Sequence, residues 1–145
     1  MTKQILILNG PNLNLLGQRE PDHYGTKTLE QIVADCTAAG KELGYSVEAY
    51  QSNNEGELVT KLQEAGKANI PVIFNPGAYS HTSIALHDAI TSAQVDVIEV
   101  HISNIHAREE FRHISIVSKV ARGVIAGLGA QGYLLALKAF SQIAK

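Results

Sequence analysis

The sequence predicts an α/β fold in which one parallel β-sheet carries helices on both faces. The main observation is that short apolar, β-rich runs alternate five times with helical patterns, which is typical of parallel strands joined by crossover helices. The composition, with 45% apolar and 18% charged residues, is that of an ordinary globular protein. The length of 145 residues suits one hydrophobic core, so we expect a single domain over residues 1–145.

The first strand, expected at residues 5–8, is an uninterrupted apolar run, as buried parallel strands usually are. The helix that follows begins at a capping box formed by Thr28 and Gln31. Its apolar side chains share one helical face and are Leu29, Ile32, Val33, Cys36 and Leu43. Gly44 stands where a helix typically ends, and the second strand is expected at residues 46–51.

The rest of the chain repeats the strand-then-helix pattern. Asn54 and Glu57 cap a second helix that runs to about Lys67. The remaining expected elements are strands at residues 71–74, 95–100 and 123–126, helices at 82–92 and 130–143, and one helical turn at 107–111. For five such strands the common order is 2-1-3-4-5, so we expect a flavodoxin-like three-layer sandwich.

Charge and cysteine content exclude several classes of protein. The net charge is −2, which gives no sign of a nucleic-acid or membrane surface. The apolar run near the N-terminus is too short for a signal peptide, so we expect a cytoplasmic protein. Cys36 is the only cysteine, and its place in a helical pattern favours a small core residue over a reactive thiol.

Polar side chains follow three of the predicted strands, over residues 9–12, 75–81 and 99–108. In sheets of this order ligands bind beyond the carboxyl ends of the strands, at the point between strands one and three. Asn and Ser also make turns and cap helices, which accounts for Asn54 and Asn104. Turn formation does not easily explain polar groups from three segments at one rim, so the pattern favours a functional cleft.

The same segments carry no cofactor motif. The first loop matches neither GxGxxG nor GxxxxGK[ST], so a nucleotide phosphate site is unsupported. His101 and His106 are five residues apart and His81 and His87 six, which is not the spacing of helical metal ligands, and HExxH is absent. We expect no metal and no cofactor. We expect three of the histidines to be solvated surface residues, namely His23, His87 and His113.

The remaining interpretation of these polar residues is acid–base chemistry without a cofactor. Glu99 lies two residues before His101, on the same face of a strand, and could hold the imidazole in its protonated form. A carboxylate on a central strand is costly unless it is paired, which supports this interpretation. Arg19 and Tyr24, in the long segment after the first strand, form a second candidate pair, because a phenol needs a nearby cation to serve as a base at neutral pH. An ordinary surface loop with an aromatic anchor remains the alternative.

Five motifs carry these candidates. They are LNGPNLNLLGQREPDHYG (8–25), QSNNEG (51–56), NPGAYSHTSIALHDAI (75–90), EVHISNIHAREEFR (99–112) and GVIAGLGAQGYLLAL (123–137). With them the chain resembles, over essentially its whole length, the type II 3-dehydroquinate dehydratases, or type II dehydroquinases. The resemblance implies a flavodoxin-like lyase that converts 3-dehydroquinate to 3-dehydroshikimate and water without a cofactor, in the shikimate pathway of aromatic amino acid biosynthesis or in quinate catabolism.

The resemblance also implies roles for individual residues. The implied catalytic residues are Tyr24, His101, Arg19, Asn12 and Glu99, with Arg108 in support. Tyr24, as a phenolate favoured by Arg19, would take the C2 proton next to the ketone. Asn12 would hold a water that steadies the enolate. His101, oriented by Glu99, would then protonate the departing C1 hydroxyl.

The implied substrate-binding residues are Asn75, His81, Asp88, Ile102, Ser103 and Arg112. The backbone N–H groups of Ile102 and Ser103 would hold the substrate carboxylate, while His81 and Arg112 would bind ring hydroxyls. Asp88 would reach the site of a neighbouring subunit, in a dodecamer built as four trimers.

Two departures from the family pattern concern assembly rather than chemistry. His87 stands where members often have arginine, and residues 113–116 replace a more usual histidine-serine-aromatic run. Two alternatives to a dehydratase stay open. One is a flavin- or nucleotide-binding module, which would be yellow or stabilised by FMN. The other is an assembly protein without activity, against which the intact Tyr24, Arg19 and His101 argue.

Overall fold

The structure, a computed structural model, describes residues 2–18 and 20–143. Its parallel sheet consists of strands β1 (Lys3–Asn9), β2 (Tyr45–Gln51), β3 (Val72–Asn75), β4 (Val97–His101) and β5 (Gly123–Ala126). The helices are α1 (Pro21–Tyr24), α2 (Leu29–Glu42), α3 (Glu55–Lys67), α4 (Ile84–Ala93) and α5 (Gln131–Gln142). The strand order is β2-β1-β3-β4-β5, which confirms the predicted topology.

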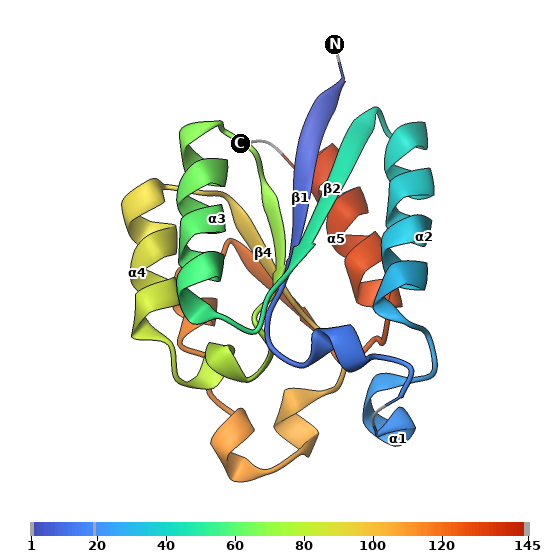
Figure 1. The fold of residues 1–145 in the computed structure, drawn as a ribbon, viewed down its shortest axis with the longest axis vertical. Coiled ribbons are helices and arrows are strands. Elements are labelled where there is room, and N and C mark those ends of the chain that lie inside the picture. Colours follow the sequence, from blue (N-terminus) through green and yellow to red (C-terminus); the bar gives the residue numbers. More distant parts are fainter. Residues whose placement is uncertain (1, 19, 144–145) are drawn as a thin grey trace.

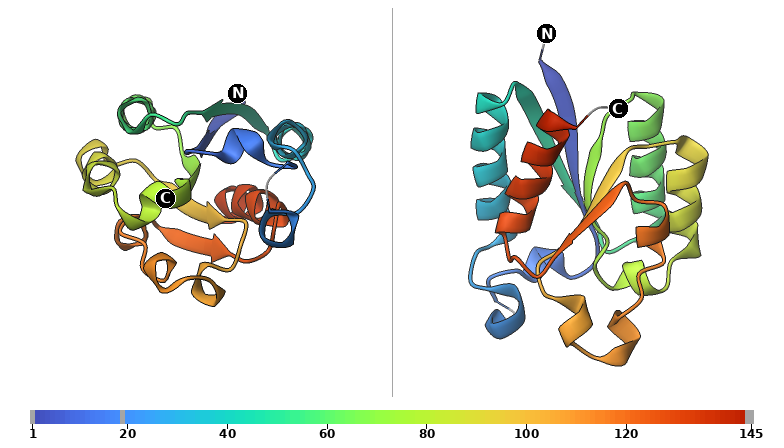
Figure 2. Two further views of the ribbon diagram at one scale, coloured as in Figure 1. Left: turned by 60° about the horizontal axis from the view of Figure 1, so that its bottom comes forward. Right: turned by 180° about the vertical axis from the view of Figure 1, so that it is seen from behind.

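Helices cover both faces of the sheet, as a flavodoxin-like sandwich requires. Helices α2 and α5 lie on one face, and α3 and α4 lie on the other (Figure 1; Figure 2, right). Side chains of β1 alternate between the two cores: Ile5 and Ile7 pack with α2 and α5, whereas Leu6 and Leu8 pack with α3 and α4. No helix among the described residues is long and apolar enough to cross a membrane.

The carboxyl ends of the strands meet at one end of the molecule, at the bottom of Figure 1. Helix α1 and two short 3-10 turns that follow β4, Ile105–Ala107 and Glu110–Arg112, gather at the same end (Figure 1). A third 3-10 turn, Val117–Lys119, packs against α4. The long polar segment after β1 is not a plain loop. It contains a 3-10 turn at Leu13–Leu15 and the four-residue helix α1.

Most element boundaries differ from the sequence prediction by one or two residues, and two differences have a clear local cause. The helix expected at residues 82–92 begins at Ile84, because the hydroxyl of Ser83 accepts a hydrogen bond from the Leu86 N–H at 2.9 Å and caps it there. The helical turn expected at residues 107–111 is wrong. Two 3-10 turns flank an extended Arg108, whose φ of −116° and ψ of −161° interrupt the helical path.

The predicted face of α2 is largely confirmed. Both halves of the capping box between Thr28 and Gln31 are present, and Ile32 and Cys36 are buried. Leu43 is 42% exposed, contrary to expectation, because the helix ends one residue before it. Burial raises the pKa of the Cys36 thiol to about 11, as expected for a core residue.

Candidate active site

A cavity of about 110 Å³ opens at the carboxyl ends of β1, β3 and β4. It is lined by most of the residues that the sequence nominates, namely Asn12, Tyr24, Asn75, His81, His101, Ile102, Ser103, Arg108 and Arg112. The prediction that three polar segments converge on one rim is therefore confirmed. We refer to this cavity as the cleft.

The floor of the cleft is formed by two loops that pack back to back. The Gly10 N–H donates to the Asn75 carbonyl at 2.8 Å, and a Cβ at Gly10 would lie only 2.3 Å from the Pro76 carbonyl oxygen. Gly77 has a φ of +61°, and a Cβ there would lie 3.0 Å from the Pro11 carbonyl oxygen. The motifs that follow β1 and β3 therefore need glycine for this close approach.

Asn12 reaches the cleft through a left-handed backbone conformation, with a φ of 69°, which asparagine tolerates better than most residues. Its backbone N–H donates to Asn53 Oδ1 at 3.0 Å. Gln51 supports the same loop, because its Nε2 donates to the Gly10 carbonyl at 3.1 Å and to Asn53 Oδ1 at 3.2 Å. The segment after β2 thus braces the segment after β1.

Glu99 and His101 form a buried pair at the end of β4. Nε2 of His101 is hydrogen-bonded to Oε2 of Glu99, as their spacing along the strand predicts. The hydroxyls of Ser115 and Ser118 each donate to the carboxylate at 2.7 Å. Burial alone would raise the pKa of Glu99, but the hydrogen bonds from His101 and the two serines outweigh it and hold that pKa below its usual value.

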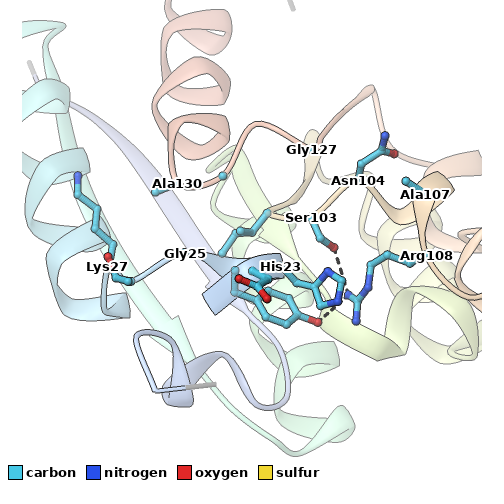
Figure 3. A pocket seen from close by; sticks show the side chains of 14 residues that line it. His23, Gly25, Lys27, Ser103, Asn104, Ala107, Arg108, Gly127 and Ala130 are labelled. Carbon is cyan, nitrogen blue, oxygen red and sulfur yellow. Dashed lines mark hydrogen bonds between the residues drawn. The ribbon is translucent and has the colours of Figure 1, made fainter. Parts of the chain in front are cut away.

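Tyr24 and Arg108 meet at the opposite wall of the cleft. Arg108 Nη1 donates to the Tyr24 hydroxyl oxygen at 2.7 Å and to Ser103 Oγ at 3.2 Å (Figure 3). The Arg108 side chain is only 6% exposed, and its guanidinium carbon lies 5.2 Å from the Tyr24 ring centroid. Arg19, the predicted partner of Tyr24, lies outside the described residues. The cation that the structure places at the phenol is Arg108.

A second, wider cavity of about 450 Å³ lies behind this pair, between α1 and the loops that follow β4 and β5 (Figure 3). Tyr24, Ile102, Ser103 and Arg108 line both cavities. The Tyr24–Arg108 pair therefore lies where the cleft and the wider cavity adjoin.

His81 faces His101 across the cleft, with nearly parallel rings whose centroids are 6.3 Å apart. The Nδ1 atom of His81 lies 2.9 Å from the Ile114 carbonyl oxygen. Burial lowers the pKa of His81 and outweighs the contact with that carbonyl, which acts in the opposite direction. A carbonyl can only accept, so Nδ1 carries the hydrogen and Nε2 of the neutral ring is left as an acceptor.

Asp88 is not brought to the cleft of its own chain. It lies on the outer face of α4 with its side chain 66% exposed and its Oδ1 2.9 Å from His87 Nδ1. His23 and His113 are exposed as expected, whereas His87 is half-buried. Among residues 2–18 and 20–143, no group of three or more His, Cys, Asp and Glu side chains could hold a metal ion.

Three residues around the cleft were not found by sequence reasoning, namely Ser115, Ser118 and Tyr133. Each hydrogen-bonds to a residue that the sequence did nominate. Asn9 was predicted as part of the polar segment that follows the first strand but was given no role, and its side-chain oxygen accepts a hydrogen bond from the Tyr133 hydroxyl.

Comparison with known proteins is consistent with this geometry. The family profile described as Dehydroquinase class II matches residues 3–141. A curated 3-dehydroquinate dehydratase of Brucella canis is 60% identical over 145 residues, which cover 100% of this chain and 92% of the relative. The crystal structure of the type II dehydroquinase from Propionibacterium acnes superimposes with a TM-score of 0.95 at 49% identity, covering 99% of each chain.

A second solved type II dehydroquinase, from Butyrivibrio crossotus, has a TM-score of 0.94 at 44% identity and covers 97% of this chain and 99% of its own. The fold, the family profile and the curated relative all agree with the resemblance seen in the sequence motifs. The chain belongs to the family of type II, or class II, dehydroquinases, whose curated relatives are 3-dehydroquinate dehydratases.

Proposed function

We propose that the chain dehydrates 3-dehydroquinate through an enolate, with Tyr24 as the base and His101 as the acid. Dehydratase activity follows from family membership, and the enolate mechanism is our proposal. The observation that supports it most directly is the convergence of the Tyr24–Arg108 and Glu99–His101 pairs on one cleft. The two pairs supply the base and the acid that elimination of water next to a ketone requires.

In the first step Tyr24, as a phenolate, takes the C2 proton beside the ketone. The Arg108 guanidinium donates a hydrogen bond at 2.7 Å, and this bond is stronger when the oxygen is charged. Because Arg108 is almost fully buried, water does little to weaken that interaction. We propose that Arg19 adds a second positive charge and that Asn12 holds the water that stabilises the enolate oxygen.

In the second step His101 donates a proton to the departing C1 hydroxyl, which leaves as water. The Glu99 carboxylate stabilises the imidazolium before the transfer, and it fixes the ring because its own oxygens are held by Ser115 and Ser118. The pair is built on a central strand, so the acid is positioned before substrate arrives.

The remaining residues of the cleft are proposed to orient the substrate. Backbone N–H groups of Ile102 and Ser103 would bind its carboxylate. His81 would accept a hydrogen bond from a ring hydroxyl at Nε2, since Nδ1 is engaged by the Ile114 carbonyl. Arg112 and Asn75 complete the contacts.

Replacing Tyr24 with phenylalanine tests the mechanism. We expect kcat to fall at least about a thousandfold with little change in KM, because the proton acceptor acts only in the transition state. Tyr45→Phe is the matched control, since the Tyr45 hydroxyl also makes a hydrogen bond, but as the donor to the Phe140 carbonyl, away from the cleft. A Tyr24→Phe enzyme with near-normal kcat would exclude Tyr24 as the base.

We also propose that the chain assembles into trimers, four of which form a dodecamer, and that Asp88 contributes to the site of a neighbouring subunit. The support from this chain is the outer face of α4, where Ile84, one turn from Asp88, is 65% exposed. Phe111 and Ile114, close to Arg112 in sequence, are 66% and 70% exposed. Such apolar exposure is typical of a subunit contact.

Sedimentation and kinetics of Asp88→Ala test the assembly proposal. We expect a smaller particle and a higher KM, because an ion pair across the contact would lose one partner. Asp22→Ala, in the segment before Tyr24, is the control and should leave the size unchanged. An Asp88→Ala protein of unchanged size and KM would show that Asp88 is an ordinary surface charge.

The biological setting is proposed from membership of the dehydroquinase family. We propose that residues 1–145 act as a single catalytic domain in the cytoplasm, on the shikimate pathway or in quinate catabolism. The cheapest test of the activity is an absorbance assay for the conjugated enone of 3-dehydroshikimate.

A further inference from the structure

A buried hydrogen-bonded group beneath the cleft joins β1, β3 and α5. Its members are Asn9, Asn75 and Tyr133, whose exposed fractions are 0%, 3% and 0%. The Tyr133 hydroxyl donates to Asn9 Oδ1 at 2.6 Å and accepts from Asn75 Nδ2 at 2.9 Å. Asn9 and Asn75 are directly paired in the parallel register of β1 and β3. Only Asn75 of the three lines the cleft.

The direction of every hydrogen bond in this group follows from one fixed donor. The backbone N–H of Gly77 can only donate, and it donates to Asn75 Oδ1 at 3.1 Å. The Asn75 nitrogen must therefore face Tyr133, whose oxygen accepts from it. The single hydroxyl hydrogen of Tyr133 is then directed to Asn9 Oδ1. The amide of Asn75 is consequently held in one of its two orientations.

We propose that Tyr133, with Asn9 as its acceptor, is a positioning residue that fixes Asn75 as a hydrogen-bond donor in the cleft. One Nδ2 hydrogen of Asn75 is used by Tyr133, and the second is left for a ligand. The ligand atom it suits is an acceptor oxygen, such as a hydroxyl or enolate oxygen of the substrate. The inference rests on the proposed role of Asn75 in substrate binding.

Two features of this group support a directional role. Burial strongly raises the pKa of Tyr133, so its hydroxyl keeps the hydrogen that defines the chain of bonds. Asn9 Nδ2 is buried and has no hydrogen-bond partner among the described residues. An unpaired buried donor is costly, and an apolar core would avoid that cost. Asn9 is therefore present for its oxygen.

A double-mutant cycle tests the proposal. Tyr133→Phe should lower kcat/KM for 3-dehydroquinate about tenfold, because Asn75 loses the partner that fixes its amide. In an Asn75→Ala background the same substitution should change kcat/KM by less than about twofold, because Tyr133 acts through Asn75. Equal losses of kcat/KM in the two backgrounds, or no loss in the first, would overturn the proposal.

The control for general destabilisation is Tyr45→Phe. Tyr45 is 7% exposed, belongs to the same core and also donates to a residue of α5, the Phe140 carbonyl at 3.1 Å. Both tyrosine variants should lower the melting temperature by a few degrees, but only Tyr133→Phe should lower kcat/KM. An equal loss of kcat/KM in Tyr45→Phe would mean that the effect is one of stability, and would overturn the proposal.

Asn9 gives a second route if Tyr133→Phe does not fold. Asn9→Asp keeps an oxygen acceptor for the Tyr133 hydroxyl and should retain kcat/KM within about threefold, whereas Asn9→Leu removes it and should lower kcat/KM about tenfold. Similar values for both variants would overturn the proposal. Full activity of Asn75→Ala would also overturn the proposal. Normal turnover by Tyr24→Phe would refute only the role of Tyr24 as the base.

Discussion

Replacing Glu99 with glutamine removes the negative charge beneath the cleft while preserving the shape of the side chain. The carboxylate accepts hydrogen bonds from His101 and Ser115 at Oε2 and from Ser118 at Oε1. A glutamine can turn its oxygen toward His101 and Ser115 and its amide group toward Ser118. The Ser118 hydroxyl can accept as well as donate, so every contact can be kept.

The expected cost of Glu99→Gln is therefore electrostatic. A hydrogen bond to a charged group contributes about 1.5–3 kcal/mol and one between neutral groups about 0.5–1.5 kcal/mol. The hydrogen bond between residue 99 and His101 thus loses about 1.4 kcal/mol, which corresponds to about a tenfold effect. We expect kcat to fall about tenfold.

Steady-state kinetics, with the enone absorbance as the signal, measure this effect. Asp96→Asn is the matched control, because Asp96 immediately precedes β4 and pairs with Arg122 at 2.9 Å at the opposite end of the sheet. The control should keep the kcat of the original enzyme. A Glu99→Gln enzyme with unchanged kcat would refute the claim that the carboxylate charge supports the acid.

Three further outcomes follow from the same geometry. The pKa of Glu99 is held below its ordinary value of 4.5, so its interactions stabilise the fold above that pH and are lost as the pH falls through the lowered pKa. In urea unfolding from about pH 6 to about pH 3, the free energy of unfolding should therefore fall less for Glu99→Gln than for the original chain. Gly10→Ala should lower stability by about 3 kcal/mol or more, since its Cβ would lie 2.3 Å from the Pro76 carbonyl oxygen, whereas Gly123→Ala meets nothing within 4 Å and should be nearly neutral by thermal melting. Turnover should survive EDTA and borohydride, and inactivation by borohydride in the presence of substrate would instead indicate an imine intermediate.

The sheet could be predicted because its signals are local. Uninterrupted apolar runs identified the strands, and the side-chain caps at Thr28 and Asn54 marked the first turns of α2 and α3. The strand order then followed from the general behaviour of five-stranded parallel sheets. These features depend on residues that are near one another in the sequence, which is why they need no tertiary information.

The parts that were missed depend on tertiary contacts. The helical turn expected at 107–111 failed because Arg108 is extended, and in that conformation its side chain reaches Tyr24 and Ser103. Helix propensity cannot report a contact with a residue 84 positions away in the chain. Ser115 and Ser118 could not be identified from the sequence for the same reason. Their hydroxyls contact Glu99 only because the fold brings residues 115–118 next to β4.

The two pairs in the cleft are supported in different ways, and this difference bears on how each responds to change. Glu99 and His101 belong to a central strand, and the carboxylate is anchored by serines from a later segment. Tyr24 belongs to a four-residue helix none of whose residues is buried, and its phenol is bound by the guanidinium of Arg108. Removing the charge of Glu99 should therefore change the energetics of the acid without moving it. A change at Arg108 should instead remove the hydrogen bond and the positive charge at the phenol oxygen on which the proposed base depends.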